Sequence, residues 1–206
     1  MMISARTISA ALLCACLLLP QARAAELTDV VVSHEDGRYR LTSTTYFDAS
    51  QSQLYKVLTD YDQFVRFTTA FVETKNRQPD EQGRPTYYTR MEGCVLMFCK
   101  SYVRVGHLEL KPQHDIVAIG DPEESNFKYS RERWQLIPRG DQTILIYDFE
   151  MEPAFWVPPV IGPFYIQRVL RRGAGRAVNR IEVLAQAIED EQTQNEQKVV
   201  KPVDLP

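Results

Sequence analysis

The sequence has few of the residues and motifs that carry catalysis or metal binding. Its 206 residues include only three histidines, His34, His107 and His114, which lie far apart along the chain. We find no glycine-rich phosphate loop, no nucleophile elbow and no metal-ligand spacing. We therefore expect no cofactor and no metal site, and the sequence alone identifies no catalytic residue.

Long apolar runs are also scarce, and the one that is present lies at the start of the chain. Arg6 precedes an apolar stretch over residues 8–19, which is too short to span a bilayer comfortably. Residues 22–24, Ala-Arg-Ala, then fit the small-x-small pattern of a cleavage site. We predict a signal peptide over residues 1–24, a cut directly before Ala25, and export to a bacterial periplasm.

An excess of positive charge is absent as well. Without the two arginines of the leader, 22 basic residues face 27 acidic ones, and the net charge falls from −3 to −5. This balance argues against a nucleic-acid-binding protein. The remaining roughly 180 residues are enough for one domain with a substantial core, which we place at residues 25–189. The tail over residues 190–206 is charged, rich in glutamine and free of aromatics, so we expect a frayed helix end followed by disorder.

Cysteine is rare, and two of the four cysteines lie in the leader, where Cys16 offers an alternative site for lipidation. Cys94 and Cys99 remain in the mature chain. In an oxidising compartment a disulfide between them is the default, and the four intervening residues suit a hairpin tip. A zinc site is less favoured, because no histidine lies nearby in sequence and two thiolates do not complete a tetrahedral shell.

What the sequence does contain is a regular succession of short extended segments. Residues 28–33 and 38–47 predict two strands joined by a turn at residues 35–37, Glu-Asp-Gly. Helical spacing follows over residues 50–59, and a second short helix is predicted over 61–69. Period-two segments separated by turn residues then predict six more strands: Phe71–Arg77, Thr86–Glu92, Lys100–Lys111, Asp115–Gly120, Asn126–Pro138 and Thr143–Glu152. The short connections favour an antiparallel meander.

The last two strands indicate which face is covered. In the last one, apolar side chains alternate with Asp148, Glu150 and Glu152, so one face is covered and the other is wet. The preceding strand is less regular, because simple alternation puts Arg131 and Arg133 on the face of apolar residues. Either that assignment is wrong, or the arginines provide a polar spot within a cavity.

The final predicted element is a long helix. Residues 154–186 open as an aromatic and proline-rich segment and continue with helical period. The stripe comprises Ile166, Leu170, Gly173, Ala177, Ile181, Leu184 and Ile188. Glycine within a helix costs about 1 kcal/mol relative to alanine, so Gly173 and Gly175 indicate a close approach to another surface. Two interpretations remain open: an ordinary packed helix, or a lid over a cavity.

This order of elements resembles the START-like superfamily, whose helix-grip fold is an α+β architecture with a curved antiparallel sheet wrapped on a long C-terminal helix. More narrowly, the chain resembles the coenzyme Q-binding and polyketide cyclase-like branch. The resemblance is carried by residues 53–62, Gln-Leu-Tyr-Lys-Val-Leu-Thr-Asp-Tyr-Asp, and by residues 156–159, Trp-Val-Pro-Pro. It implies an apolar ligand, such as a lipid, a quinone or a polyketide-like molecule, held between the sheet and the last helix.

Strand and helix periodicity, combined with this resemblance, predict the residues that line the ligand site. Those from the sheet are Tyr88, Met91, Tyr102, Leu145, Tyr147, Phe149 and Met151, with Arg131 or Arg133 as a polar anchor. Those from the last segment are Trp156, Tyr165, Val169, Leu170, Gly173 and Ala177.

An entrance is predicted where two apolar loops meet. In a meander, alternate connections lie at one end of the sheet, which groups the loops at residues 94–99, 121–125 and 153–163. The apolar residues Val95, Leu96, Met97, Phe98, Phe155 and Trp156 are unusual for loops, which normally run through water. They either pack on the last helix or form an entrance that touches a membrane. Arginines at 168, 171, 172, 176 and 180 are either a solvated helix face or an attraction for anionic lipid.

Three functions remain open at this stage. The first is a periplasmic carrier of a lipid or isoprenoid quinone. The second is an aromatase or cyclase acting on a hydrophobic substrate. The third is a module that docks an envelope partner without a ligand. A cavity of about 300 Å³ or more would favour a ligand, and the sequence does not give the oligomeric state.

Overall fold

A computed structural model of the chain describes residues 25–95 and 98–200, with the backbone alone for residues 94, 95, 98 and 190–200. The eight strands are β1 (Glu26–Glu35), β2 (Arg38–Phe47), β3 (Phe71–Arg77), β4 (Thr86–Val95), β5 (Phe98–Lys111), β6 (Asp115–Gly120), β7 (Phe127–Arg139) and β8 (Gln142–Pro153). The helices are α1 (Gln51–Thr59), the 3-10 helix η2 (Tyr61–Arg66) and α2 (Gly162–Val200).

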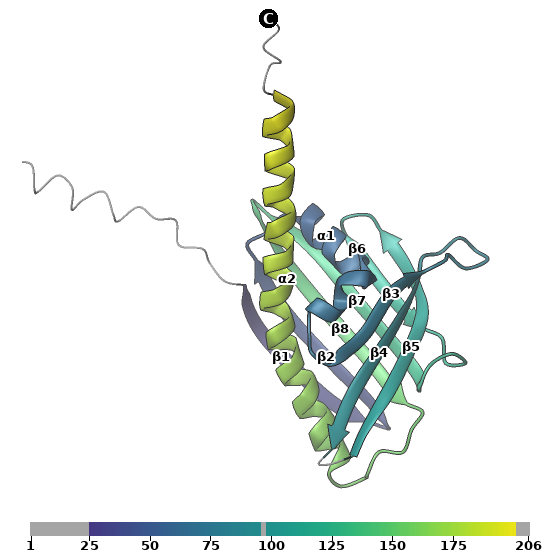
Figure 1. Cartoon of the computed structure of the whole chain (residues 1–206). Coiled ribbons are helices and arrows are strands. Elements are labelled where there is room, and N and C mark those ends of the chain that lie inside the picture. Colours follow the sequence, from purple (N-terminus) through teal and green to yellow (C-terminus); the bar gives the residue numbers. More distant parts are fainter. Residues whose placement is uncertain (1–24, 96–97, 201–206) are drawn as a thin grey trace, which may run out of the picture.

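All eight strands form one antiparallel sheet in the order β1-β2-β8-β7-β6-β5-β4-β3. Strands β3 to β8 follow each other as the predicted meander, and β2 joins β8 to extend it. Figure 1 shows that the sheet is curved, that α1 and η2 lie over its concave face, and that α2 crosses this face beside β1. The predicted helix-grip architecture is confirmed.

Local sequence explains the turns and the first helix. The β1–β2 hairpin turns at Asp36 and Gly37, which both have positive φ, as a type I′ turn requires. Helix α1 begins with a capping box, in which the side chain of Ser50 accepts from Gln53 and the side chain of Gln53 accepts from Ser50. Its apolar residues are buried against the sheet.

The inner face of the sheet carries two apolar clusters. The first cluster joins α1, η2 and the middle of α2 to the sheet; it includes Phe47, Leu54, Leu58, Tyr61, Phe64, Tyr87, Trp134, Leu136, Ile181 and Leu184. The second cluster lies nearer the start of α2. Its buried members are Tyr39, Phe127 and Met151, and its partly buried members are Met91, Tyr102, Phe149, Phe155, Ile166 and Leu170. The first cluster is the closed core, whereas most of the second retains some exposure.

The predicted faces of β7 are wrong beyond Phe127, because the strand contains a β-bulge. The ladder with β8 shifts register between Phe127 and Tyr129. Phe127 therefore packs on the inner face, while Tyr129, Arg131 and Arg133 lie on the outer face. The guanidinium of Arg38 lies 4.7 Å from the ring of Tyr129 on that outer face. The break in alternation noted in the sequence therefore reflects the bulge, and the two arginines do not point inward.

The ends of the last elements also differ from prediction. Residues 154–161 form an irregular exit segment, and α2 starts only at Gly162. Helix α2 continues to Val200, so the predicted frayed tail is helical as far as the structure describes it. No helix among the described residues is both long and apolar enough to cross a membrane. The predicted signal peptide lies outside the described residues.

Candidate functional site

Among the described residues, one arginine is buried on the inner face. Arg104, on β5, is 4 % exposed. Its Nε donates to Ser130 Oγ at 2.9 Å, and its Nη2 donates to the carbonyl oxygen of Ala118 at 3.3 Å. Its Nη1 forms an ion pair with the carboxylate of Glu132 on β7. A buried charge is costly unless it is paired and hydrogen-bonded, and Arg104 satisfies both conditions.

Glu132 is held from a second side by a tyrosine. The hydroxyl of Tyr147, on β8, donates to Glu132 Oε1 at 2.8 Å. Burial, reinforced by the charge and hydrogen bond of Glu132, raises the pKa of Tyr147 well above its ordinary value. Burial opposes the charge of Arg104, but Glu132 and the neighbouring tyrosines outweigh it, so the pKa of Arg104 is also raised. Arg104 stays positive and Tyr147 stays a hydrogen-bond donor.

Two further tyrosines complete this polar cluster. The rings of Tyr61 and Tyr87 stack with centroids 4.5 Å apart, and the Arg104 guanidinium lies 5.2 Å from the Tyr87 ring. Both hydroxyls are buried and have no hydrogen-bond partner among the described residues. Burial raises the pKa of Tyr87 to about 12 and that of Tyr61 well above its usual value, so both hydroxyls keep their protons. Each unpaired buried hydroxyl costs roughly 1–3 kcal/mol.

The polar cluster, defined as Arg104, Glu132, Tyr147, Tyr61 and Tyr87, lies at the junction of the two apolar clusters. Tyr61 and Tyr87 belong to the first cluster. The Arg104 guanidinium is 5.7 Å from the ring of Phe149, which belongs to the second cluster. Through Arg104, the polar cluster therefore connects the closed core to the second cluster.

The two glycines of α2 have different surroundings. By helical spacing, Gly173 shares a flank with Ile166 and Ala177. A Cβ atom added at Gly173 would meet nothing within 4 Å, and one at Gly175 would make ordinary contact with Leu27 at 3.8 Å. The predicted reason for these glycines, a close approach of α2 to another surface, is therefore wrong. Gly173 instead borders open space.

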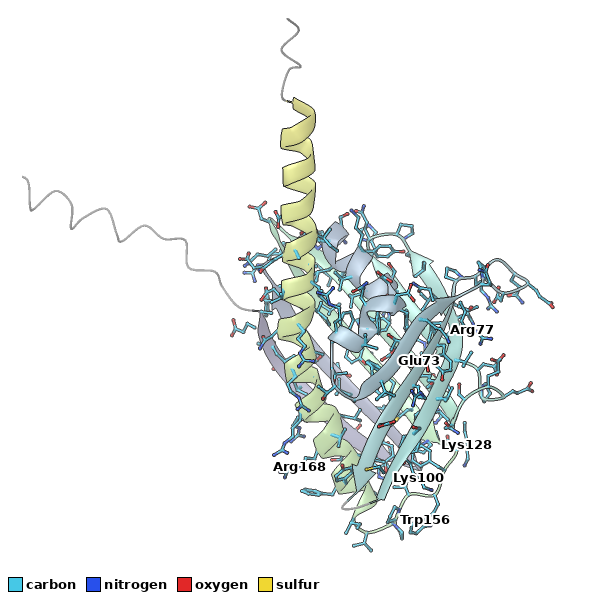
Figure 2. The ribbon with its side chains drawn as sticks, viewed as in Figure 1. Glu73, Arg77, Lys100, Lys128, Trp156 and Arg168 are labelled. Carbon is cyan, nitrogen blue, oxygen red and sulfur yellow. The ribbon has the colours of Figure 1, made fainter. Side chains whose placement is uncertain are left out.

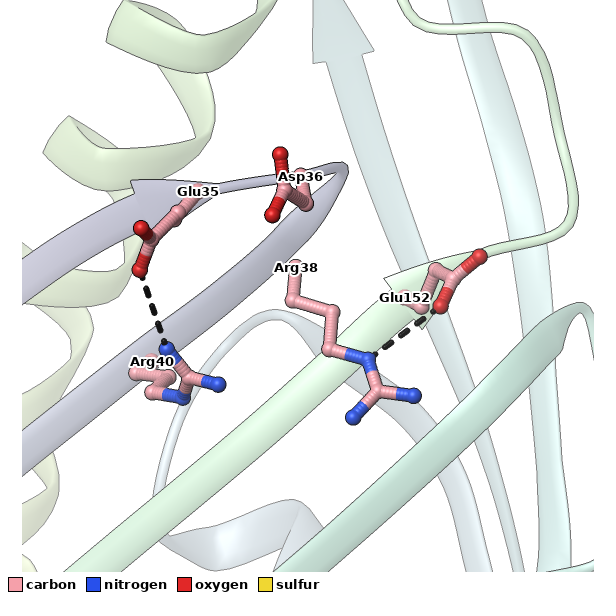
Figure 3. Close-up of a pocket in the computed structure, with 5 residues that line it drawn as sticks. All are labelled: Glu35, Asp36, Arg38, Arg40 and Glu152. Atoms are coloured by element: carbon pink, nitrogen blue, oxygen red, sulfur yellow. Dashed lines mark hydrogen bonds and ion pairs between the residues drawn. The ribbon is translucent and has the colours of Figure 1, made fainter.

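Two hollows formed by the described residues lie elsewhere. One of about 370 Å³ is lined by Glu35, Asp36, Arg38, Arg40 and Glu152, whose ion pairs are drawn in Figure 3. The other, of about 180 Å³, is lined by Arg40, Leu41, Thr42, Arg131, Arg133, Asp148, Phe149 and Glu150. Charged groups of the outer face dominate both linings. Neither hollow is the apolar cavity expected beneath α2.

Most predicted ligand residues of the sheet do lie on the inner face. Met91, Tyr102 and Phe149 are partly buried in the second cluster together with Leu170 of α2, and Met151 is buried among them. Leu145, Tyr147 and Ala177 pack in or against the first cluster. Tyr165 is half-buried in the first turn of α2.

Four predicted ligand residues point elsewhere. Tyr88 lies on the outer face, where the Lys75 ammonium is 4.8 Å from its ring, because Tyr87 and Thr89 occupy the inner positions of β4. Arg131 is outward because of the β7 bulge. Trp156 is 79 % exposed and Val169 is 46 % exposed. None of these four lines the inner face.

The sequence analysis missed the polar cluster itself, apart from Tyr147. Arg104 lies two residues after Tyr102, so strict alternation assigns both to one face of β5. The inward position of Arg104 could therefore have been predicted from the sequence. Glu132 was hidden by the β7 bulge, which reverses the alternation that starts at Phe127.

Two of the loops predicted to share one end of the sheet do lie together, while their role as an entrance stays a prediction. The backbone N–H of Ala154 donates to the carbonyl oxygen of Asn126 at 3.0 Å, which joins two of the loops. The ring of Phe155 packs 4.2 Å from that of Tyr102 and 6.0 Å from that of Phe127, so Phe155 points inward. The end of β4 and the start of β5 lie at this end of the sheet as well. Leu96 and Met97 lie outside the described residues, as do the side chains of Val95 and Phe98.

An exposed apolar lip spans the exit segment and the first turn of α2. Its members are Trp156 at 79 %, Val160 at 86 %, Ile161 at 55 % and Phe164 at 70 % exposure. The segment folds tightly here, because a Cβ atom at Gly162 would lie 2.3 Å from Val157 Cγ1. Figure 2 shows Trp156, Lys100 and Lys128 at the same end of the molecule, with Arg168 on the nearby part of α2. Apolar side chains bordered by cations suit an anionic lipid surface.

Comparisons with known proteins point to one family. The sequence profile described as polyketide cyclase / dehydrase and lipid transport matches residues 38–182. A comparison with curated proteins finds no match.

Similar solved structures share the fold at low identity. A STAR-related lipid transfer protein from Xanthomonas axonopodis is 12 % identical, with 80 % of this chain and 99 % of that chain covered and a TM-score of 0.60. A START superfamily protein from Mycobacterium smegmatis is 16 % identical, with 72 % and 98 % covered and a TM-score of 0.56. An aromatase/cyclase from a Streptomyces species is 12 % identical, with 72 % and 94 % covered and a TM-score of 0.57.

These structures establish the START-like fold, and the profile match spans most of the chain. The chain therefore belongs to the family of polyketide cyclases/dehydrases and lipid-transport proteins.

Proposed function

We propose that the protein is an exported carrier that binds a hydrophobic small molecule, a lipid or an isoprenoid quinone, between the sheet and α2. One observation supports the proposal: the partly exposed second cluster lies beside a buried polar cluster in which two hydroxyls have no partner among the described residues. Two unpaired hydroxyls destabilise a fully packed core, whereas an amphipathic ligand would supply the hydrogen-bond acceptor that they lack.

The ligand class follows from the chemistry of the two ends. The second cluster offers Met91, Tyr102 and Phe149 to an apolar chain or ring, with burial of each such side chain worth about 1.5–3 kcal/mol. Tyr61 and Tyr87 offer neutral hydroxyl donors to an oxygen acceptor. A quinone carbonyl or a lipid ester or hydroxyl oxygen meets this requirement, and a pure hydrocarbon does not.

The exposed apolar lip provides a route for loading. Trp156, Val160, Ile161 and Phe164 would insert into the interfacial region of a membrane while Arg168 contacts anionic headgroups. Each of these residues is exposed in the structure, so brief membrane contact covers surface that is otherwise in water.

Export and the hairpin disulfide belong to the same proposal. The leader over residues 1–24 directs the chain out of the cytoplasm and into an oxidising compartment, in which thiols form disulfides. The register of β4 and β5 makes Cys94 and Cys99 direct cross-strand partners, a spacing that a disulfide can bridge. The bond would fix the hairpin tip beside the lip. Reaction of both thiols with a maleimide without prior reduction would contradict it.

A substitution at Gly173 tests the ligand space without disturbing a contact. Gly173→Leu places a side chain where no atom lies within 4 Å of the Cβ, and it removes a helix-destabilising glycine. We expect a folded protein, at least as stable as the wild type, that takes up less than a tenth of the quinone or phospholipid that the wild type extracts from vesicles. Gly175→Ala is the matched control, because it removes a glycine on the β1 side of α2.

A cyclase is the second candidate, and the same polar cluster favours it. Arg104, Glu132 and Tyr147 place charge and a neutral donor on the inner face, where a donor could polarise a substrate carbonyl. Incubation with a hydrophobic polyketone distinguishes the two functions. A carrier binds it unchanged, whereas a cyclase produces the absorbance of a dehydrated aromatic ring. Partner capture without any bound lipid would instead favour the docking module.

A further inference from the structure

A buried carboxylate lies far from the polar cluster, on the opposite half of α2. Glu182 is 4 % exposed. Its Oε1 accepts from the backbone N–H of Asp48 at 2.8 Å, and its Oε2 accepts from the backbone nitrogen of Ala25. Glu182 thus joins α2 to the start of β1 and to the turn between β2 and α1.

This carboxylate has no cationic side chain against it. None of the ion pairs between described residues includes Glu182, and its two partners are backbone groups. A buried carboxylate is costly without a compensating charge. The arrangement therefore has a place for one positive charge, at the nitrogen of Ala25.

Ala25 is also the residue that would begin the chain after cleavage of the proposed signal peptide. Hydrolysis of the bond between residues 24 and 25 consumes one water molecule, leaves a carboxylate on residue 24 and frees the nitrogen of Ala25. That amine takes up a proton at neutral pH. The backbone N–H that contacts Glu182 then becomes an ammonium group without having to move.

We propose that removal of the signal peptide creates a buried ion pair between the α-ammonium of Ala25 and the carboxylate of Glu182, which locks β1 to α2 in the mature protein. This inference rests on the export part of the proposed function and is independent of ligand binding. The uncleaved chain lacks the charge, so processing and full stability are coupled. Charge-assisted hydrogen bonds are roughly twice as strong as neutral ones.

Chains with defined first residues test the lock. One preparation begins at Ala25, and the other begins three residues earlier, at Ala22, so that the nitrogen of Ala25 remains an amide. We expect the melting temperature of the chain that begins at Ala25 to be higher by about 4 °C or more. Glu182→Gln should abolish the difference, while Glu189→Gln, at an exposed position of α2, should preserve it. Acetylation of the Ala25 amine should lower the melting temperature to that of the longer chain.

Equal melting temperatures for the two chains, or a difference that survives in Glu182→Gln, would overturn the lock. The mass of the protein recovered after export gives its first residue, and a first residue other than Ala25 would overturn the coupling to processing. Neither result depends on lipid uptake, so the lock and the carrier function fail separately.

Discussion

At the scale of single residues, the inner face combines a satisfied charge with unsatisfied hydroxyls. Arg104 donates hydrogen bonds to Ser130 and Ala118 and forms an ion pair with Glu132, and these interactions offset the cost of burying its charge. The buried hydroxyls of Tyr61 and Tyr87 have no hydrogen-bond partner among the described residues. The proposed function assigns these two hydroxyls to the ligand.

Removal of these hydroxyls separates stability from binding. In Tyr61→Phe and Tyr87→Phe, the unpaired group disappears and the ring packing remains, so each variant should be as stable as the wild type or gain about 1 kcal/mol. Ligand affinity should fall roughly 3–10-fold, the worth of one hydrogen bond. Urea unfolding and ligand titration measure the two effects. A loss of stability with unchanged affinity would show that the hydroxyls serve the fold.

Alkaline pH reports on the same buried tyrosines. An unfolded tyrosine ionises near pH 10, whereas Tyr87 keeps its proton to about pH 12 because it is buried. Between these values the folded state binds more protons than the unfolded state, so the free energy of unfolding should fall as pH rises from about 10 to about 12. Tyr87→Phe should reduce this slope, and Tyr88→Phe on the outer face should not. Equal slopes in the wild type and Tyr87→Phe would contradict the burial argument.

At the scale of elements, periodicity predicted the strands better than it predicted their faces. The bounds of β2, β3 and β6 match the predicted segments, because turn residues and alternation agree there. One bulge in β7 was enough to turn Arg131 outward, and nothing in a period-two pattern reveals a bulge in advance. The prediction for Tyr88 was wrong for a simpler reason. Met91 lies three residues later, and in a regular strand two side chains three residues apart point to opposite faces.

The sequence could not predict the polar cluster as a unit. Arg104 and Tyr147 lie on strands separated by β6 and β7 in the sheet order, and Tyr61 comes from η2. Only the curvature of the sheet and the packing of η2 bring these groups together. The lip was found in part: Trp156 is exposed as a loop tip should be, whereas Phe164 lies in the first turn of α2 and reads as an ordinary helical residue.

The exit segment and the start of α2 carry their own prediction. Trp156→Ser combined with Phe164→Ser removes two exposed apolar side chains, and should weaken binding to vesicles with anionic lipid at least tenfold. The fold should be unaffected, since both positions are in water. Val183→Ser, at a 65 % exposed site of α2, is the control. Cosedimentation measures the effect, and unchanged binding of the double variant would remove the lip from the loading route.

At the scale of the whole molecule, the sheet and α2 divide the protein into a closed half and a partly open half. The first cluster fixes α2 to α1, η2 and the sheet. The second cluster leaves apolar side chains partly exposed beneath the other half of α2, near the lip. In the proposed carrier, the closed half would provide the stable core and the partly open half the surface for the ligand.

Native mass spectrometry of the full protein, recovered from its own compartment and after incubation with vesicles that contain phospholipid and isoprenoid quinone, tests the central claim most directly. We predict one bound lipid or quinone molecule per chain in the wild type, and its loss in Gly173→Leu. A wild-type protein that carries no such molecule from either source would contradict the carrier function and leave only the fold.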